Sequence, residues 1–178
     1  MTKSPMKKDK KLPRQKVWQR RPELLLGPPI PAPMHGMAPR VVLGVNWWNR
    51  TRRAAYASTN WHCVACGVFK KDAKSRAWLE AHELYEIDFL LGKMTYVEAV
   101  PLCTYCHHYC HPGRMRYLLE ENKITHAKYA AIVQHGDAVL KAARLKRPEP
   151  VQLPTVAAED WRLVIDDVEY ARKDFVDA

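Results

Sequence analysis

The chain has 178 residues and a formal net charge of +10, which suits one folded domain with tails. No apolar run approaches membrane-spanning length, and no apolar stretch follows the basic start as a secretory signal would, so we expect a soluble cytoplasmic protein and no membrane partner. Five cysteines at this length are too few for a disulfide scaffold, and a reducing compartment favours thiols that bind metal.

Residues 1–40 are expected to form a basic, proline-containing extended arm. Nine of residues 1–22 are Lys or Arg, and prolines recur at positions 28, 29, 31, 33 and 39, which favours an extended chain. The arm is either a solubilising tail or a phosphate-binding segment. Thirteen of the 29 basic residues but only two of the 19 acidic residues precede Cys63, so a phosphate-binding surface is to be sought in this part first.

A helix is expected next, within residues 41–58, because Asn46 can cap it. The tryptophans that follow Asn46 are interpreted as core anchors rather than as platforms for stacking bases. The helix carries three arginines that either lie along a nucleic-acid backbone or form an ordinary solvated face: Arg50, Arg52 and Arg53.

Two Cys-x-x-Cys pairs bracket the centre of the chain, Cys63 with Cys66 and Cys103 with Cys106. Each pair can present two thiolates to one ion, and two such turns complete a tetrahedron around zinc. The alternative is two unrelated pairs of buried cysteines, which the spacing makes less favourable. Cys110 is interpreted as a small buried side chain.

Three histidines lie between and just after these pairs. His82 falls in a segment rich in strand-forming residues, with a connection expected at residues 89–96. His107 and His111 are four apart, so on one helix they share a face, and Pro112 with Gly113 is expected to end that helix. A lone histidine is more often structural, but three framed by a zinc scaffold indicate a second metal site.

Basic residues flank this central region. The loop after the first cysteine pair contributes Lys70, Lys71 and Lys74, and Arg114 follows the last histidine, where a phosphate contact is expected. Helices are expected from Arg114, from 126 to 134 after a Thr125 cap with Gly136 as the stop signal, and from Asp137 to 145.

The predicted organisation has three parts: the arm at 1–40, a zinc-binding domain with covering helices at 41–147, and an acidic linker with a β-hairpin at 148–178. The hairpin is expected to turn near Asp166 and Asp167. The fold class is α+β.

The pattern CxxCG, LExHE and VPLCxxCHxxxHxG, over about residues 61–114, resembles the HNH endonucleases, also called ββα-metal or His-Me finger nucleases. The closest resemblance is to a zinc-containing subgroup from phages and bacteria, so the host cytoplasm is the expected location if a phage encodes this chain. The resemblance implies a ββα-metal module stabilised by the four-cysteine zinc site. It also implies that His82, His107 and His111 hold a catalytic divalent metal.

Two positions depart from the family pattern. The residue after the first ligand, usually a histidine that acts as general base, is Glu83, and the usual asparagine is replaced by Glu98. A glutamate accepts protons less well at neutral pH because its free pKa is near 4.3. The catalytic set implied by the resemblance is therefore Glu83, His82 and His107.

The predicted function is a metal-dependent DNA endonuclease, with duplex DNA as partner, structural zinc and a second divalent cation (Mg²⁺, Mn²⁺, Ni²⁺ or Zn²⁺). Ligands rich in imidazole suit a transition metal better than magnesium. Two alternatives stay open. One is a catalytically degenerate, zinc-containing nucleic-acid-binding protein, and the other is a protein-binding adaptor or inhibitor that uses zinc only for folding.

Overall fold

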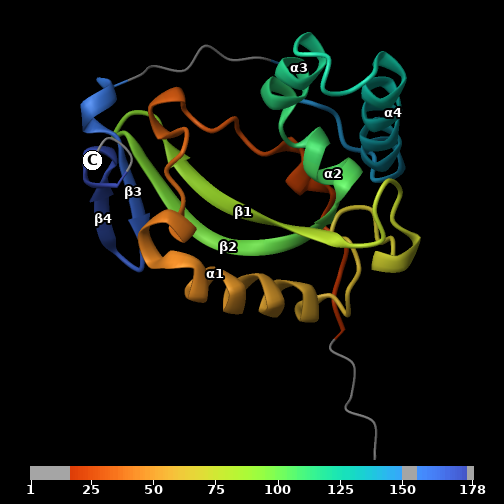
Figure 1. The fold of residues 1–178 in the computed structure, drawn as a ribbon, viewed down its shortest axis with the longest axis horizontal. Coiled ribbons are helices and arrows are strands. Elements are labelled where there is room, and N and C mark those ends of the chain that lie inside the picture. Colours follow the sequence, from red (N-terminus) through yellow and green to blue (C-terminus); the bar gives the residue numbers. More distant parts are fainter. Residues whose placement is uncertain (1–16, 150–155, 176–178) are drawn as a thin grey trace, which may run out of the picture.

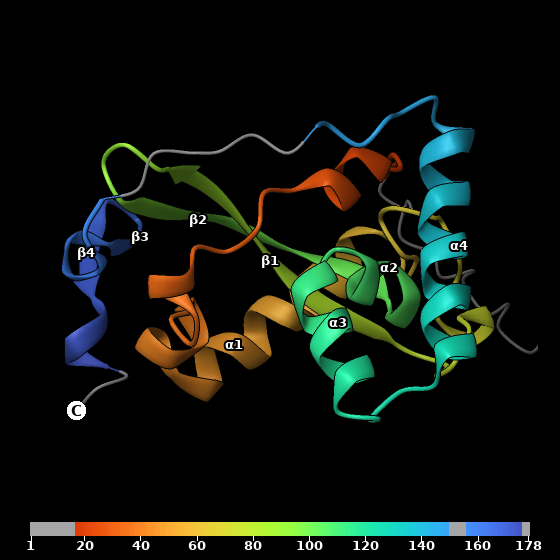
Figure 2. The ribbon, with the colours of Figure 1, turned by 90° about the horizontal axis from the view of Figure 1, so that it is seen from above.

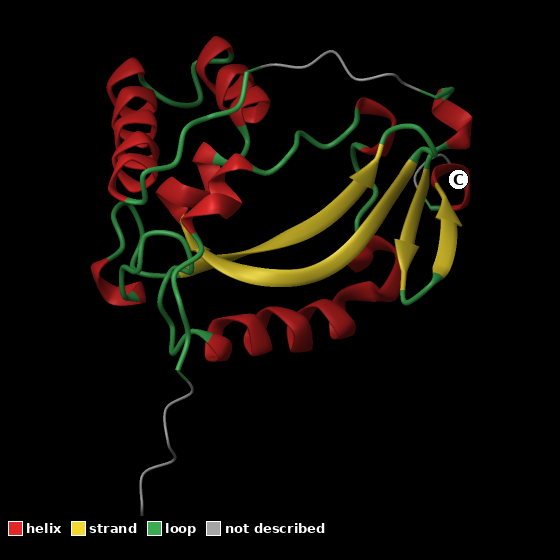
Figure 3. Ribbon diagram, turned by 180° about the vertical axis from the view of Figure 1, so that it is seen from behind, coloured by secondary structure: helices red, strands yellow, loops and turns green. Residues whose placement is uncertain are grey.

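A four-stranded sheet forms the centre of the computed structural model, which describes residues 17–149 and 156–175. The strands lie in chain order: β1 (Leu79–Asp88), β2 (Lys93–Cys103), β3 (Arg162–Ile165) and β4 (Val168–Ala171). β1 and β2 form a long curved antiparallel pair, β3 joins β2 in parallel, and β4 pairs antiparallel with β3 (Figure 3). With the four helices described next, this architecture confirms the α+β class.

The helices lie on both faces of the β1–β2 pair (Figure 1). They are α1 (Pro39–Ser58), α2 (Thr104–Tyr109), α3 (Pro112–Glu120) and α4 (His126–Ala142). α1 runs along one face, where the ring of Trp47 meets that of Tyr96 edge-on at 5.7 Å. α2, α3 and α4 gather over one half of the opposite face, as the view from above shows (Figure 2). In the part of the chain described, no helix is both long and apolar enough to cross a membrane.

Two hydrophobic cores hold these layers together. The first lies beneath α2 and α4 and includes Leu102 and Ile132 together with the cysteine pairs. The second lies at the other end of the sheet and includes Met94, Trp161 and Leu163. Because Trp161 and Leu163 are fully buried, the C-terminal hairpin is part of the sheet and not a solvated appendage. Its predicted turn at Asp166–Asp167 is confirmed, and both residues have a positive φ.

The expectation of an extended, unpacked arm over residues 1–40 is wrong from Arg21 onwards, where the Arg21 N–H donates to the Val64 carbonyl at 2.7 Å. Two short 3-10 helices, Pro22–Leu26 and Ala32–Met34, bring apolar side chains into the cores, and Leu25 is 2% exposed. The segment crosses over the sheet before α1 begins (Figure 2). Burying these side chains offsets the entropy of ordering the chain. The most basic stretch, up to residue 16, lies outside the described residues.

Helix boundaries differ from the expected ones at two places. The helical segment begins earlier than expected, at Pro39, but Gly44, with a non-helical φ of 77°, divides it, so the part that carries the three arginines begins close to Asn46 as expected. The cap at Thr125 is confirmed, because its hydroxyl accepts the Lys128 N–H, but α4 then runs unbroken through Gly136. The β1–β2 connection is also shorter than expected, since β2 already begins at Lys93.

Gly136 continues the helix because Tyr109 of α2 packs directly against it. A Cβ at Gly136 would lie 2.1 Å from Cδ2 of Tyr109, so only glycine allows this approach of α2 to α4. The Tyr109 hydroxyl also donates a hydrogen bond of 2.6 Å to Asp137 Oδ1. Tertiary packing therefore prevails over the local tendency of glycine to end a helix.

We expect Gly136→Ala to destabilise the protein by about 1–3 kcal/mol, because the overpacking outweighs the better helix propensity of alanine. Gly113→Ala in α3 is the matched control, because a Cβ there has no atom within 4 Å. We expect that control to be neutral or stabilising by up to about 1 kcal/mol. Thermal unfolding measures both, and equal melting temperatures for the two variants would contradict the packing argument.

Candidate metal centres

The first cysteine pair sits in a tight turn between α1 and β1. The Cys63 N–H donates to the Val68 carbonyl and the Gly67 N–H donates to the Cys63 carbonyl, both at 2.9 Å. Gly67 has a φ of 80°, the left-handed conformation that such a turn requires. The turn places Cys63 and Cys66 on one side, facing the end of β2.

The second pair spans the junction of β2 and α2. Cys103 is the last residue of β2 and the N-cap of α2, and its sulfur accepts the Cys106 N–H at 3.5 Å. The same short segment therefore begins the helix and directs two sulfur atoms toward the first pair.

The four sulfur atoms, from Cys63, Cys66, Cys103 and Cys106, all lie within 4.8 Å of one another. The sulfurs of Cys66 and Cys103 are 3.8 Å apart. Zinc–thiolate bonds of about 2.3 Å in a tetrahedron imply a sulfur separation of about 3.8 Å, so the spacing fits one zinc ion. The cluster could hold a structural metal such as zinc.

The pKa shifts of the clustered cysteines also favour a bound cation. Hydrogen bonds with Cys103 and Cys106 lower the pKa of Cys63, whereas the hydrogen bond with Cys103, together with burial, raises the pKa of Cys106. Four thiols in one buried site therefore do not ionise equally by themselves, and a cation is what stabilises all four thiolates together. Burial raises the pKa of the separate Cys110 to about 12, consistent with its interpretation as a small buried side chain.

His135 of α4 lies beside this cluster, and the sequence pattern did not single it out. Its Nε2 is 3.4 Å from the Cys106 sulfur and 3.9 Å from the Cys103 sulfur, and the Tyr105 ring meets it edge-on. An imidazole N–H in this position can donate to thiolate ligands and hold them in place. Only the packing of α4 against α2 brings it there.

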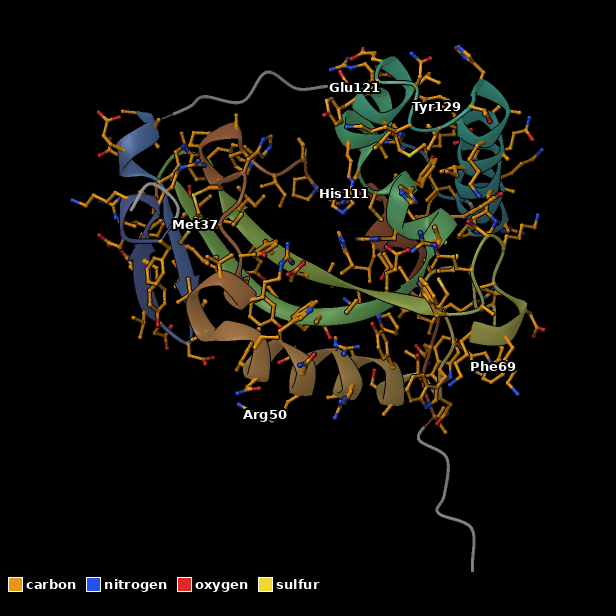
Figure 4. The ribbon with its side chains drawn as sticks, in the orientation of Figure 1. Met37, Arg50, Phe69, His111, Glu121 and Tyr129 are labelled. Carbon is orange, nitrogen blue, oxygen red and sulfur yellow. The ribbon has the colours of Figure 1, made fainter. Side chains whose placement is uncertain are left out.

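The second cluster consists of His82 on β1, His107 on α2 and His111, which Figure 4 labels, between α2 and α3. The expectation that His107 and His111 share one helix face is wrong, because α2 ends at Tyr109. Pro112 begins α3 instead of ending a helix, as its fixed φ suits a first helical position. Its ring also disfavours the helical conformation for His111, the residue before it.

The side chains of the three histidines nevertheless lie close together. Each offers one ring nitrogen, and these atoms lie within 4.8 Å of one another. The ring centroids are 5.4 Å apart for His82 and His107, and 5.0 Å apart for the other two pairs. Burial, followed by the charge of its histidine neighbours, lowers the pKa of His82 to about 3. Burial, followed by the charges of His107 and Arg114, lowers the pKa of His111 to about 4. Both rings are therefore neutral at pH 7, the state in which imidazole binds a metal.

Glu80 orients this cluster, although the sequence analysis passed over it. The His107 Nδ1–H donates to Glu80 Oε2 at 2.6 Å, and the Thr104 hydroxyl donates to Glu80 Oε1 at 2.9 Å. The hydrogen bond from His107 is the main reason that the pKa of Glu80 falls to about 2. Because this hydrogen bond uses the Nδ1 atom of His107, the Nε2 atom of the same ring is left to bind a metal. The signal was present in the sequence, because residues two apart on a strand share a face and Glu80 precedes His82 by two.

Glu83, the predicted general base, is not among the side chains that converge in the histidine cluster. Adjacent residues on a strand point to opposite faces, so Glu83 lies on the α1 side of the sheet, where it forms an ion pair with Arg40. Glu98 pairs in register with Leu84 and is engaged by Arg21, at 2.5 Å. Both glutamates therefore form ion pairs with arginines: Arg21 lies before α1 and Arg40 lies at its start.

The predicted phosphate-contacting residues are spread over three surfaces. Arg50 and Arg53 are exposed on α1, Lys71 and Lys74 are exposed near the 3-10 turn Lys70–Asp72, and Arg114 is exposed on α3, close to His111. Arg52 and Lys70 line a groove beside β1. The structure thus brings only Arg114 to the histidine cluster itself.

Fold and site together define an α+β protein whose described residues contain two clusters of candidate metal ligands, one of four thiols and one of three imidazoles. Comparison with protein-family models, with curated proteins and with solved structures finds no match for the chain.

Proposed function

We propose that the protein is a metal-dependent DNA endonuclease of the HNH, or ββα-metal, type. The observation that carries this proposal is the convergence of His82, His107 and His111 within 4.8 Å beside a four-cysteine cluster. In this proposal β1, β2 and α2 form the ββα-metal module, and zinc bound by the cysteines stabilises it.

The histidine cluster fits a divalent transition metal. Its three rings are partly buried, burial keeps His82 and His111 neutral at pH 7, and Glu80 orients His107, which is the usual environment of metal-binding imidazoles. A divalent ion held there would act as a Lewis acid on a phosphoryl oxygen and lower the pKa of a bound water, which reduces the need for a protein base. Glu83 is accordingly not assigned that role.

The charge around the cluster suits a phosphodiester substrate. Arg114 stands beside His111, where it could contact a phosphate next to the cluster, whereas the basic residues of α1 lie across the sheet. The most basic stretch precedes residue 17, so a phosphate-binding arm remains part of the proposal.

The experiment that tests the proposal is incubation of purified protein with supercoiled plasmid in Mg²⁺, Mn²⁺, Ni²⁺ or Zn²⁺. We expect nicked or linear plasmid with at least one transition metal and none in excess chelator. Intact plasmid with every metal, together with intact single-stranded substrate, would end the endonuclease proposal.

A second candidate is a nucleic-acid-binding protein that has lost catalysis. Two ion pairs favour it, one between Glu83 and Arg40 and one between Glu98 and Arg21. Because both carboxylates are held in ion pairs, neither is free to assist a reaction. This candidate predicts salt-dependent DNA binding without cleavage in any metal. The plasmid assay and a binding titration on the same preparation separate the two functions.

We expect Glu80→Gln to weaken metal binding at the histidine cluster by about 10–100-fold, because it removes the carboxylate that holds His107. Competition with a chromophoric chelator measures the dissociation constant. Glu86→Gln is the matched control, since Glu86 is exposed on the same strand. Equal affinities for the two variants would show that Glu80 does not orient a ligand.

A further inference from the structure

A groove runs beside the start of β1, the edge strand of the sheet. It has a volume of about 470 Å³ and lies near the turn that Phe69 marks in Figure 4. α1, the turn and β1 all contribute to its walls, and its lining includes Arg52, Tyr56, Trp61, Lys70, Trp78 and Glu80.

The walls of the groove are aromatic and unusually open to solvent. Trp61 is 39% exposed and Trp78 is 49% exposed, and the Tyr56 ring lies 5.5 Å from that of Trp61. Most tryptophans bury far more of their surface, and exposed aromatic groups gathered in a concave site indicate a binding function. None of these three rings was interpreted as a binding residue from the sequence.

Cationic side chains lie over two of these rings, those of Trp61 and Trp78. Lys70 Nζ is 3.8 Å from the centroid of the Trp61 ring, and the Arg76 guanidinium is 4.8 Å from that of Trp78. Arg52 adds a further positive charge, and its Nε donates to Asn49 Oδ1 at 2.9 Å. Among the described residues, Glu80 is the only acid that lines the groove, and its hydrogen bond with His107 directs its charge toward the histidine cluster. The groove therefore presents flat apolar surfaces surrounded by positive charge.

We propose that this groove is a stacking site for an unpaired nucleobase, so that the protein binds single-stranded or locally opened DNA in preference to an intact duplex. Aromatic planes combined with cations recognise a base together with its phosphate, without regard to sequence. In an intact duplex both faces of each base are covered by neighbouring bases, so only an unpaired base can enter the groove. The proposal rests on the proposed function in taking the ligand to be DNA.

The position of the groove links it to the histidine cluster. Glu80 lines the groove and at the same time bonds His107, so a single side chain separates the two sites. No strand covers the outer edge of β1 within the described residues. A DNA strand that follows this edge places a base in the groove and a neighbouring phosphate beside the histidines and Arg114.

The test is a binding titration of the full chain with fluorescently labelled oligothymidylate and with a duplex of the same length. We expect tighter binding of the single strand, and about a tenfold loss of that affinity in Trp78→Ala, with little change for the duplex. Trp78→Phe should restore most of the affinity, because the stacking plane returns. The salt dependence should keep its slope in Trp78→Ala, since that slope counts phosphate contacts and not stacking.

Tyr117→Ala is the matched control. Tyr117 is 50% exposed on α3 and also carries a cation, Lys123, 4.8 Å from its ring centroid, but it does not line the groove. Trp61→Ala is a second variant, whose fold is checked by thermal unfolding because Trp61 has a positive φ. Unchanged single-strand affinity in Trp78→Ala, or an equal loss for single strand and duplex, would overturn the proposal.

Three further outcomes are decisive. If Trp78→Ala keeps the oligonucleotide affinity but loses affinity for polyglutamate, the groove is a site for acidic protein and the nucleobase proposal fails. If the groove binds single strands as expected but no substrate is cut in any metal, the stacking site stands and the endonuclease proposal fails. If Trp78→Ala changes neither the rate of cleavage nor the affinity for single strands, the endonuclease proposal stands and the stacking proposal fails.

Discussion

Removing metal from the four-cysteine cluster is expected to unfold the region built around it, with a loss of apparent stability on the order of 10 kcal/mol. The cluster joins the turn after α1 to the β2–α2 junction, and three of its four cysteines are buried in the first core. Without a cation, four thiols in this space cannot all ionise, and the two ends lose the bond that connects them. We expect one tightly held zinc per chain, and unfolding by circular dichroism when a strong chelator extracts it.

Cys106→Ser and Cys110→Ser form a matched pair for this prediction. Cys106 belongs to the cluster, whereas Cys110 lies outside it, and its thiol donates only a long 3.8 Å hydrogen bond to the Leu24 carbonyl. We expect Cys106→Ser to lose zinc and most of its thermal transition, and Cys110→Ser to keep both. Full zinc content in Cys106→Ser would show that the four sulfurs do not share an ion.

The second large effect is expected at the histidines. On the proposed function, His107→Ala removes one of three metal ligands and leaves Glu80 without its principal partner, so we expect cleavage to fall by at least about 10²-fold, together with weaker binding of the second metal. Plasmid nicking followed over time measures the rate, and a chelator competition measures the metal affinity. A variant that keeps its metal and its rate would remove the histidine cluster from the mechanism.

Glu83→Gln is the informative comparison for His107→Ala. If Glu83 were the general base, its loss would reduce the rate by about 10²–10⁴-fold. Because it lies on the opposite face and pairs with Arg40, we expect a change below about tenfold, with unaltered metal affinity. A loss as large as that of His107→Ala would restore Glu83 as the base, and the ion pair with Arg40 would then have to open during the reaction.

The grouping of the four cysteines as candidate metal ligands was predictable from the sequence because it depends on short-range geometry. Two residues between cysteines define a turn that presents both thiols to one side, so the spacing alone predicts the sulfur cluster that the structure shows. The strand around His82, the cap at Thr125 and the turn at Asp166–Asp167 are likewise determined by the backbone preferences of a few neighbouring residues.

Other features were decided by contacts between residues far apart in the chain. Gly136 stays helical because Tyr109 lies against it, His135 reaches the thiols because α4 packs on α2, and the segment before α1 is ordered because Leu25 is buried. None of these contacts follows from a local pattern, since each depends on two surfaces that meet only after folding. The opposite directions of His82 and Glu83 follow from the two-residue period of a strand, but the partner of each side chain was decided by which helix covers which face.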